Sequence, residues 1–189
     1  MDAARGSGTD GQARLGGAAL LVSAVVAIVA IAFLVAMFAS FAAGSQADGE
    51  RYGLINDVLV IVQYALMLPA VVAIHRLSRD RAPKLGAAVL VSGFALVALI
   101  ALGQGLLVAG VMTFEQQTVP LTIMFVLLAA WFVAVGSLVG SIGIARRGIV
   151  MGLLGATYIG YPAWAWWLGR ALREGAPTNA TAPTAELPA

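Results

Sequence analysis

The residues of this 189-residue chain that could do chemistry are a few polar side chains inside long apolar runs. Asp57 and Tyr64 are seven positions apart, as are Asn56 and Gln63. At that spacing two residues of a helix share a face, so the pairs lie on neighbouring faces of one helix. Further polar side chains at comparable depth in other runs are Gln104, Tyr158 and Tyr161. Polar groups in hydrocarbon are costly, and they mark functional or structural contacts.

Two interpretations of this polar set remain open. In the first, a small polar cavity open to the outside is lined by Asn56, Asp57, Gln63, Tyr64, Gln104, Tyr158 and Tyr161, and the Asp57 carboxylate binds a cation or a proton. In the second, these groups only form hydrogen bonds between helices, worth about 0.6 kcal/mol each on average. Asp57 would also suit the first turn of a helix, where the dipole favours negative charge.

Several kinds of active site are excluded by what the chain lacks. It has one histidine, His75, and no cysteine, so one copy cannot form a bis-histidine haem site, a histidine-rich metal site or an iron–sulfur cluster. No glycine-rich loop precedes a Lys-Ser or Lys-Thr pair, so nucleotide hydrolysis is not supported. We expect no catalytic, cofactor-binding or metal-binding residue. We also expect no nucleic-acid partner, because the net charge of +2 follows from the placement of cations between apolar runs.

The elements that carry the polar residues are five apolar runs. Hydrophobic residues make up 61% of the chain and charged residues 11%, against about 25% charged residues in soluble domains. A helix needs about 20 apolar residues to cross a hydrocarbon core, and only helices satisfy their own backbone groups there. The sequence predicts an all-α polytopic membrane protein, a bundle of five transmembrane helices over residues 15–43, 54–74, 85–112, 121–145 and 149–168.

The domain organisation follows from these runs. One transmembrane domain covers residues 15–172, between a disordered cytoplasmic tail (1–14) and a disordered Ala/Pro/Thr-rich tail (173–189). The first run exceeds the 7–15 residues of a signal peptide core, so we expect a retained helix. The positive-inside rule places eight Lys and Arg residues inside and three outside, namely Arg51, Arg170 and Arg173, when the N-terminus is cytoplasmic. The prediction is N-in and C-out, in a bacterial plasma membrane (the cell inner membrane).

Small residues and tryptophans predict how the helices pack and where they meet the interface. Close packing between membrane helices relies on small side chains, here Gly136, Ser137, Gly140, Ser141, Gly148 and Gly152. We expect them to pack the fourth and fifth helices together, with a dimer seam as the alternative. Trp164, Trp166 and Trp167 are predicted to anchor the outer interface, with a ligand-stacking platform as the alternative. Pro69 and Pro162 are predicted to kink their helices.

A resemblance covers most of the chain. Its motifs are Ala13-Arg14-Leu15-Gly16-Gly17, then Tyr64-Ala65-Leu66-Met67-Leu68-Pro69 with a basic turn, then Trp131 and Gly136 before Ala145-Arg146-Arg147-Gly148. This arrangement resembles small bacterial multi-pass membrane families classed as domains of unknown function. The resemblance implies a multi-span helical fold and no catalytic residue.

Three functions are compatible with the sequence. The leading hypothesis is a non-enzymatic accessory or interaction subunit, whose partners are the lipid bilayer and another membrane protein or a second copy of the chain. The first alternative is a small transporter or channel that uses the polar cluster around Asp57. The second is a membrane enzyme acting on a lipid or isoprenoid substrate, which requires two ionisable groups to converge in a pocket.

Overall fold

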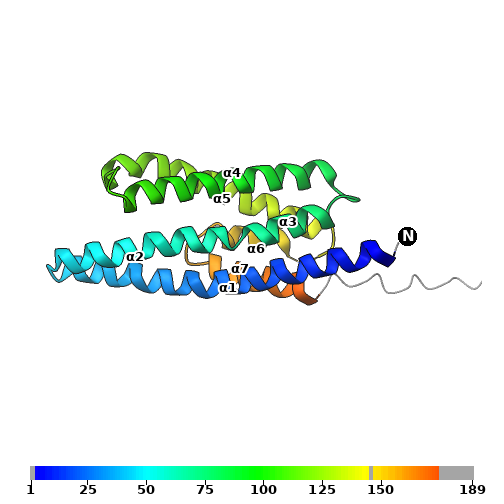
Figure 1. The fold of residues 1–189 in the computed structure, drawn as a ribbon, viewed down its shortest axis with the longest axis horizontal. Helices are drawn as coiled ribbons and strands as arrows, with labels where there is room; N and C mark the ends of the chain where they lie inside the picture. The colour runs from blue at the N-terminus through cyan, green and yellow to red at the C-terminus, as the bar shows by residue number, and fades with distance from the viewer. Residues whose placement is uncertain (1–2, 145–146, 175–189) are drawn as a thin grey trace, which may run out of the picture.

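The computed structural model describes residues 3–144 and 147–174, without the side chains of residues 3–10, and the secondary structure of this part consists of helices joined by turns. Figure 1 shows the helices in chain order: α1 (Ala3–Ala42), α2 (Gln46–Ala65), α3 (Leu68–Leu77), α4 (Pro83–Val108), α5 (Phe114–Ser141), α6 (Gly148–Gly155) and α7 (Tyr161–Glu174). Arg146 and the tail predicted to be disordered after Glu174 lie outside the described residues.

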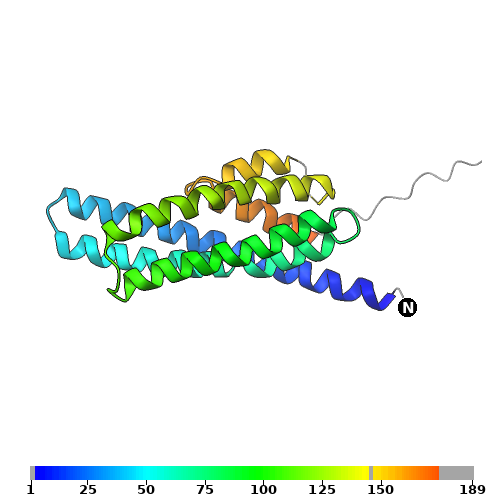
Figure 2. The ribbon, with the colours of Figure 1, turned by 90° about the horizontal axis from the view of Figure 1, so that it is seen from above.

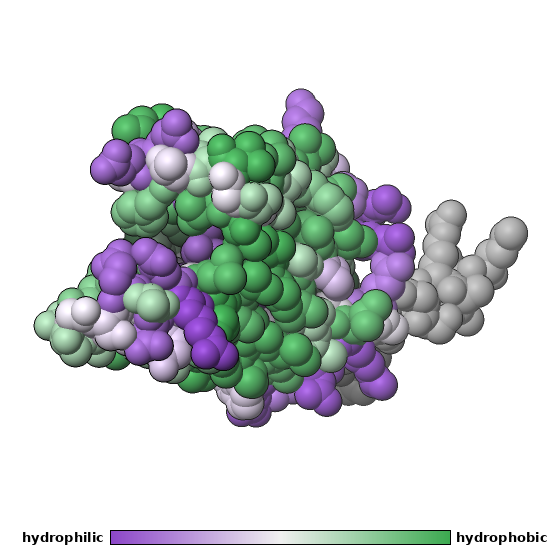
Figure 3. Space-filling model, turned by 60° about the vertical axis from the view of Figure 1, so that its left-hand side comes forward, coloured by the Kyte–Doolittle hydropathy of each residue, from purple (hydrophilic) through white to green (hydrophobic). Residues whose placement is uncertain are grey.

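Four stretches of helix are long and apolar enough to cross a membrane: Gly11–Ala42, Gln46–Leu77, Pro83–Val108 and Phe114–Ser141. The second stretch combines α2 and α3, which are separated at Leu66 and Met67 just before Pro69. Proline has no N–H for the helical hydrogen bond, which explains the interruption. Figure 3 shows a broad hydrophobic surface over the middle of the molecule, with hydrophilic residues towards its two ends. The architecture is that of a helical membrane protein.

Hydroxyl groups on this apolar surface bond to their own helices. Ser92 Oγ donates to Ala88 O at 2.6 Å, and Thr122 Oγ1 donates to Thr118 O at 2.7 Å, although both side chains are exposed. In hydrocarbon no water replaces a missing hydrogen bond, so an exposed hydroxyl must bond within the protein. These local bonds suit a surface that faces lipid.

The long helices form two antiparallel hairpins, and the two short helices lie alongside them. Figures 1 and 2 show α1 paired with α2 and α4 paired with α5 along the long axis of the molecule. Helix α6 packs on α5 and α7 packs on α1, while α4 contacts both α2 and α3. The short helices therefore cover only the half of the bundle nearer the N-terminus of α1.

The expected fifth span is instead two short helices. Helix α6 has 8 residues and α7 has 14, about 12 and 21 Å of helix, and neither has the about 20 residues of a membrane span. The chain turns between them, where Gly160 N donates to Thr157 Oγ1 at 2.9 Å, and Pro162 then fits the first turn of the new helix. The prediction of five spans is corrected to four long helices and a broken fifth segment.

Helix α7 runs antiparallel to α1, back towards the end of the bundle where α1 begins. Gly169 lies against Gly17, and Tyr161 lies against Ser23, further along α1. Glu174 therefore lies at the same end of the bundle as the start of α1. This arrangement does not support the predicted C-out end, because the run 149–168 folds back on itself.

The N-terminal segment also differs from the prediction. Helix α1 begins at Ala3, so helix extends through residues 3–14, which we expected to be a disordered tail. Adding turns to an existing helix avoids the unfavourable nucleation step, which explains how a polar, glycine-containing segment continues the apolar helix.

The small residues bring α5 and α6 into backbone contact. A Cβ added to Gly136 would overlap Gly148 O, and one added to Gly152 would lie 2.5 Å from Phe132 O. At Gly140 the nearest Gly148 atoms would be 3.9 Å away, an ordinary contact. Ser137 Oγ and Ser141 Oγ donate to Val133 O and Leu138 O of their own helix. The close approach therefore depends on the glycines.

We expect Gly136→Ala to destabilise the protein by about 1–3 kcal/mol, because the new methyl group meets backbone that cannot move away easily. The measurement is the free energy of unfolding in mixed micelles. Gly105→Ala is the matched control, because a Cβ there meets nothing within 4 Å and the change improves helix propensity. Equal stabilities for the two variants would contradict the packing described here.

Candidate functional site

The most buried polar contact joins α1, α2 and α7. Ser23 Oγ donates to Gln63 O at 2.6 Å and lies 2.6 Å from Tyr161 Oη. Tyr161 Oη also lies 3.4 Å from Gln63 O, so both hydroxyls are close to this carbonyl. All three residues are at most 1% exposed. This cluster ties the returning helix α7 to the first hairpin.

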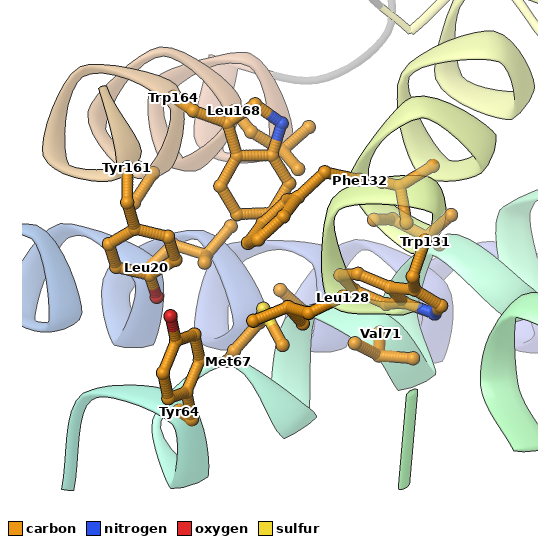
Figure 4. Packing of buried hydrophobic residues seen from close by; sticks show 14 of the residues in the cluster. Leu20, Tyr64, Met67, Val71, Leu128, Trp131, Phe132, Tyr161, Trp164 and Leu168 are labelled. Carbon is orange, nitrogen blue, oxygen red and sulfur yellow. The ribbon is translucent and has the colours of Figure 1, made fainter. Parts of the chain in front are cut away.

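Aromatic rings surround this contact (Figure 4). The Tyr161 ring lies 5.5 Å from Tyr64 and 5.7 Å from Phe132, and Phe132 lies 4.6 Å from Trp164 between ring centroids, all edge to face. Such pairs contribute about 0.5–1.5 kcal/mol beyond the area that they bury. Tyr64, expected to line a cavity, is 3% exposed and belongs to this core.

The tryptophans expected at the outer interface have different environments. Trp164 is 1% exposed and packs in the core, which corrects the prediction that it anchors the interface. Trp166 is 52% exposed and Trp167 is half-buried. Because α7 folds back, none of the three lies at the end of the bundle opposite the N-terminus.

Two further contacts join other helices. Tyr158 Oη, in the turn between α6 and α7, donates to Asn56 Oδ1 of α2 at 3.0 Å. Gln117 Nε2 of α5 donates to Gln104 Oε1 of α4 at 3.5 Å, and both side chains are buried. Apart from Asp57, the predicted polar residues are thus divided among these contacts between helices.

The Asp57 side chain is half-buried beside Asn56. Helix α2 begins at Gln46, so Asp57 lies eleven residues inside it, and the first turn carries Asp48 instead. The helix dipole therefore does not account for Asp57. Figure 3 shows a hollow between the end of the α1–α2 hairpin and the end of the α4–α5 hairpin.

Ser23 and Gln117 belong to these contacts but were not among the predicted site residues. Ser23 is a lone hydroxyl in the middle of the first apolar run, and that polarity at membrane depth was the signal for it. Gln117 lies between the predicted spans 85–112 and 121–145, but α5 begins at Phe114, and Thr113 caps it through the backbone N–H of Gln116. The capping box in the sequence Thr113–Gln116 could have moved Gln117 into the helix.

The side chain of Gln63 differs from the rest of the set. It is 1% exposed, and within the described part of the chain neither its Nε2 nor its Oε1 has a hydrogen-bond partner. Gln117 Oε1 is also buried without one. A buried amide without a partner costs about 1–3 kcal/mol. The Gln63 amide is therefore a buried polar group whose placement packing between helices does not explain.

Charge separates strongly between the two ends of the bundle. At the end where α1 turns into α2 and α4 turns into α5, the described residues carry Asp48, Glu50 and Glu115 with one cation, Arg51. Among the described side chains, the opposite end carries two acids, Asp80 and Glu174, and all the other cations: Arg14, Arg76, Arg79, Arg81, Lys84, Arg147, Arg170 and Arg173. Arg81 Nη1 donates to Ile142 O and so joins the loop before α4 to the end of α5.

An apolar groove of about 430 Å³ runs between α1 and α7. It is lined by Ala24, Val25, Ile28 and Ile31 of α1 and by Ile159, Pro162, Ala163 and Trp166 at the other side. The groove lies beside the turn at residues 156–160, where α7 begins and leaves α1. An apolar concave site of this size suits a hydrocarbon group.

Among the residues that the structure describes, no group of three or more His, Asp or Glu side chains could hold a metal ion. Comparisons of the chain with protein-family models, with curated proteins and with solved structures find no match. Function is therefore inferred from the geometry of the polar contacts and the groove.

The contact between Ser23 and Tyr161 gives a measurable prediction. Ser23→Ala and Tyr161→Phe should each destabilise the protein, and a double-mutant cycle should give a coupling of about 0.6 kcal/mol and at most about 1.7. Unfolding in mixed micelles measures it. Ser92→Ala is the control and should change stability little, because Ser92 bonds only within its own helix. Zero coupling would show that the buried contact does not contribute to stability.

Proposed function

We propose that this chain is a non-enzymatic membrane protein, an accessory or interaction subunit that binds lipid or another membrane protein. The observation that carries the proposal is the use of the polar groups: Ser23 with Tyr161, Asn56 with Tyr158, and Gln104 with Gln117. Paired in this way, they stabilise helix contacts and do not converge on a reacting group. The groove between α1 and α7 supports the proposal, because it is apolar and lies on the lipid-facing surface.

We further propose that the end with the cations faces the cytoplasm of a bacterial cell, so that the start of α1 and the end of α7 lie on the same side of the plasma membrane. Cytoplasmic loops are enriched in Lys and Arg. The fold-back of α7 supports this orientation, because it moves Arg170 and Arg173 to the basic end and leaves only Arg51 opposite among the described cations.

A transporter or channel is the second candidate, and one observation favours it. The buried Gln63 amide has no partner among the described residues, and Asp57 lies on the same helix towards the acidic end. Water or a cation that reached Gln63 from that end would give its buried amide a polar partner.

The orientation can be tested by labelling cysteines, because the natural chain has none. Ala43→Cys, in the turn between α1 and α2, should react with a membrane-impermeant maleimide on intact cells. Glu174→Cys, at the end of α7, should react only after the membrane is opened, since the structure places it at the basic end. Its ion pair with Arg170 is exposed, so the substitution costs little stability. Reaction of Glu174→Cys on intact cells would contradict this orientation and favour the five-span prediction with its C-terminus outside.

The choice between subunit and transporter can be tested on the purified protein in liposomes. We expect cation flux no faster than in empty liposomes, and unchanged flux in Asp57→Asn and Gln63→Leu, because the subunit proposal gives these residues no transport role. Native mass spectrometry in mild detergent should show a defined complex with lipid or with a protein partner. A flux that Asp57→Asn abolishes and Glu115→Gln leaves intact would overturn the subunit proposal in favour of transport.

A further inference from the structure

We propose that the groove between α1 and α7 holds an acyl chain of an anionic phospholipid, whose phosphate is bound by arginines at the basic end of the same two helices. The proposal deepens the proposed function and rests on it, because it names the lipid class that such a subunit would bind. Three features support it: the shape of the groove, the charge at its end and the distance between them.

The shape of the groove suits a hydrocarbon chain. Helices α1 and α7 meet closely at Gly17 and Gly169, where an added Cβ would lie 2.5 Å from backbone oxygen. Further along, the groove opens between Val25 and Ile28 of α1 and Trp166 of α7, each more than half exposed. Only apolar residue types line the groove. An occupant with polar groups at that depth would therefore lose the hydrogen bonds of those groups on binding.

Cations lie at the end of the groove where the two helices meet. Arg170 follows Trp166 by four residues, so it is one turn further on the same face of α7. The Arg173 side chain lies against α1 at Gly17, and Arg14 is exposed about one turn before Gly17. Glu174 pairs with Arg170 at 2.8 Å, but both side chains are 62% exposed, so this pair is weak. Among the side chains that the structure describes here, three arginines against one carboxylate leave a net positive charge for a phosphate.

The distances agree with the length of a lipid. Trp166 and Pro162 are four and eight residues from Arg170, about 6 and 12 Å along the helix. One leaflet of the hydrocarbon core is about 15 Å thick. A phospholipid with its phosphate at Arg170 therefore places its acyl chain along the groove. On the orientation proposed above this is the cytoplasmic leaflet, which carries the anionic lipids.

Charge also argues against a second copy of the chain as the occupant. A two-fold symmetric dimer in a membrane brings the same residues of both copies together at the same depth. Such a seam along α1 and α7 would gather the arginines of both copies, and like charges repel. An anionic lipid places opposite charge at that point.

The proposal can be tested by quenching tryptophan fluorescence with brominated lipids. The protein is reconstituted in two sets of phosphatidylcholine vesicles. One set contains a small fraction of phosphatidylglycerol brominated in the acyl chain, and the other contains the same fraction of brominated phosphatidylcholine. Trp166 is the exposed reporter, Trp167 is half-buried, and Trp131 and Trp164 are at most 4% exposed. Trp166→Phe gives the background from the other tryptophans. We expect brominated phosphatidylglycerol to quench Trp166 several-fold more effectively than brominated phosphatidylcholine.

Matched variants test the contribution of the arginines and the contribution of the groove separately. Arg170→Gln and Arg173→Gln should each reduce the preference for phosphatidylglycerol about fivefold, and Arg51→Gln at the other end should not. Ala163→Phe should fill the groove and abolish the preference, whereas Ala98→Phe on the exposed face of α4 should keep it. Circular dichroism of each variant checks that the helices are retained.

Each possible result either supports or overturns the proposed lipid site. Equal quenching by both lipids in the natural sequence would overturn the lipid site but leave the accessory-subunit proposal standing. A disulfide-linked dimer formed efficiently by Ala163→Cys would overturn it in favour of a second copy in the groove. Preference for phosphatidylglycerol together with cation flux that depends on Asp57 would support the lipid site while the subunit proposal fails.

Discussion

The lack of water in the hydrocarbon core is the constraint on which the rest of this structure depends. Every polar group there must find its partner inside the protein. The exposed hydroxyl of Ser92 bonds to its own helix, whereas the buried hydroxyls of Ser23 and Tyr161 bond across three helices. The same rule therefore produces local bonds on the lipid-facing surface and long-range bonds in the core.

The turn between α6 and α7 is the element from which the functional features derive. Because the chain reverses there, Tyr158 reaches Asn56 and Tyr161 reaches Ser23. The apolar groove lies beside the same reversal, which also carries Arg170 and Arg173 to the basic end. The polar contacts, the groove and the charge asymmetry thus share one structural cause.

Glycine makes this arrangement sterically feasible. Gly136, Gly148 and Gly152 allow α6 to lie directly against α5, and Gly17 and Gly169 allow α7 to lie directly against α1. Lipid tails are as apolar as leucine, so helices gain little by hiding leucine from lipid and associate through close packing instead. Short helices without a full span of their own depend on such contacts to stay in place.

The sequence alone determined that the chain is helical, that long apolar stretches dominate it and that Gly136, Gly148 and Gly152 are small-residue positions on two successive segments. These properties follow from composition and spacing, which act locally. The sequence did not determine the path of residues 149–168, because an apolar run of about 20 residues is equally compatible with one span and with two short helices. Pro162 and Gly160 marked a break there, but only contacts with α1 and α5 decided that the chain turns back. For the same reason Trp164 was expected at the interface and lies in the core. Tyr64, Tyr158 and Tyr161 were expected around one cavity, but Tyr64 and Tyr161 pack together in the core and Tyr158 bonds to Asn56. The partner of a polar side chain lies on another helix, and only the tertiary structure decides which helix that is.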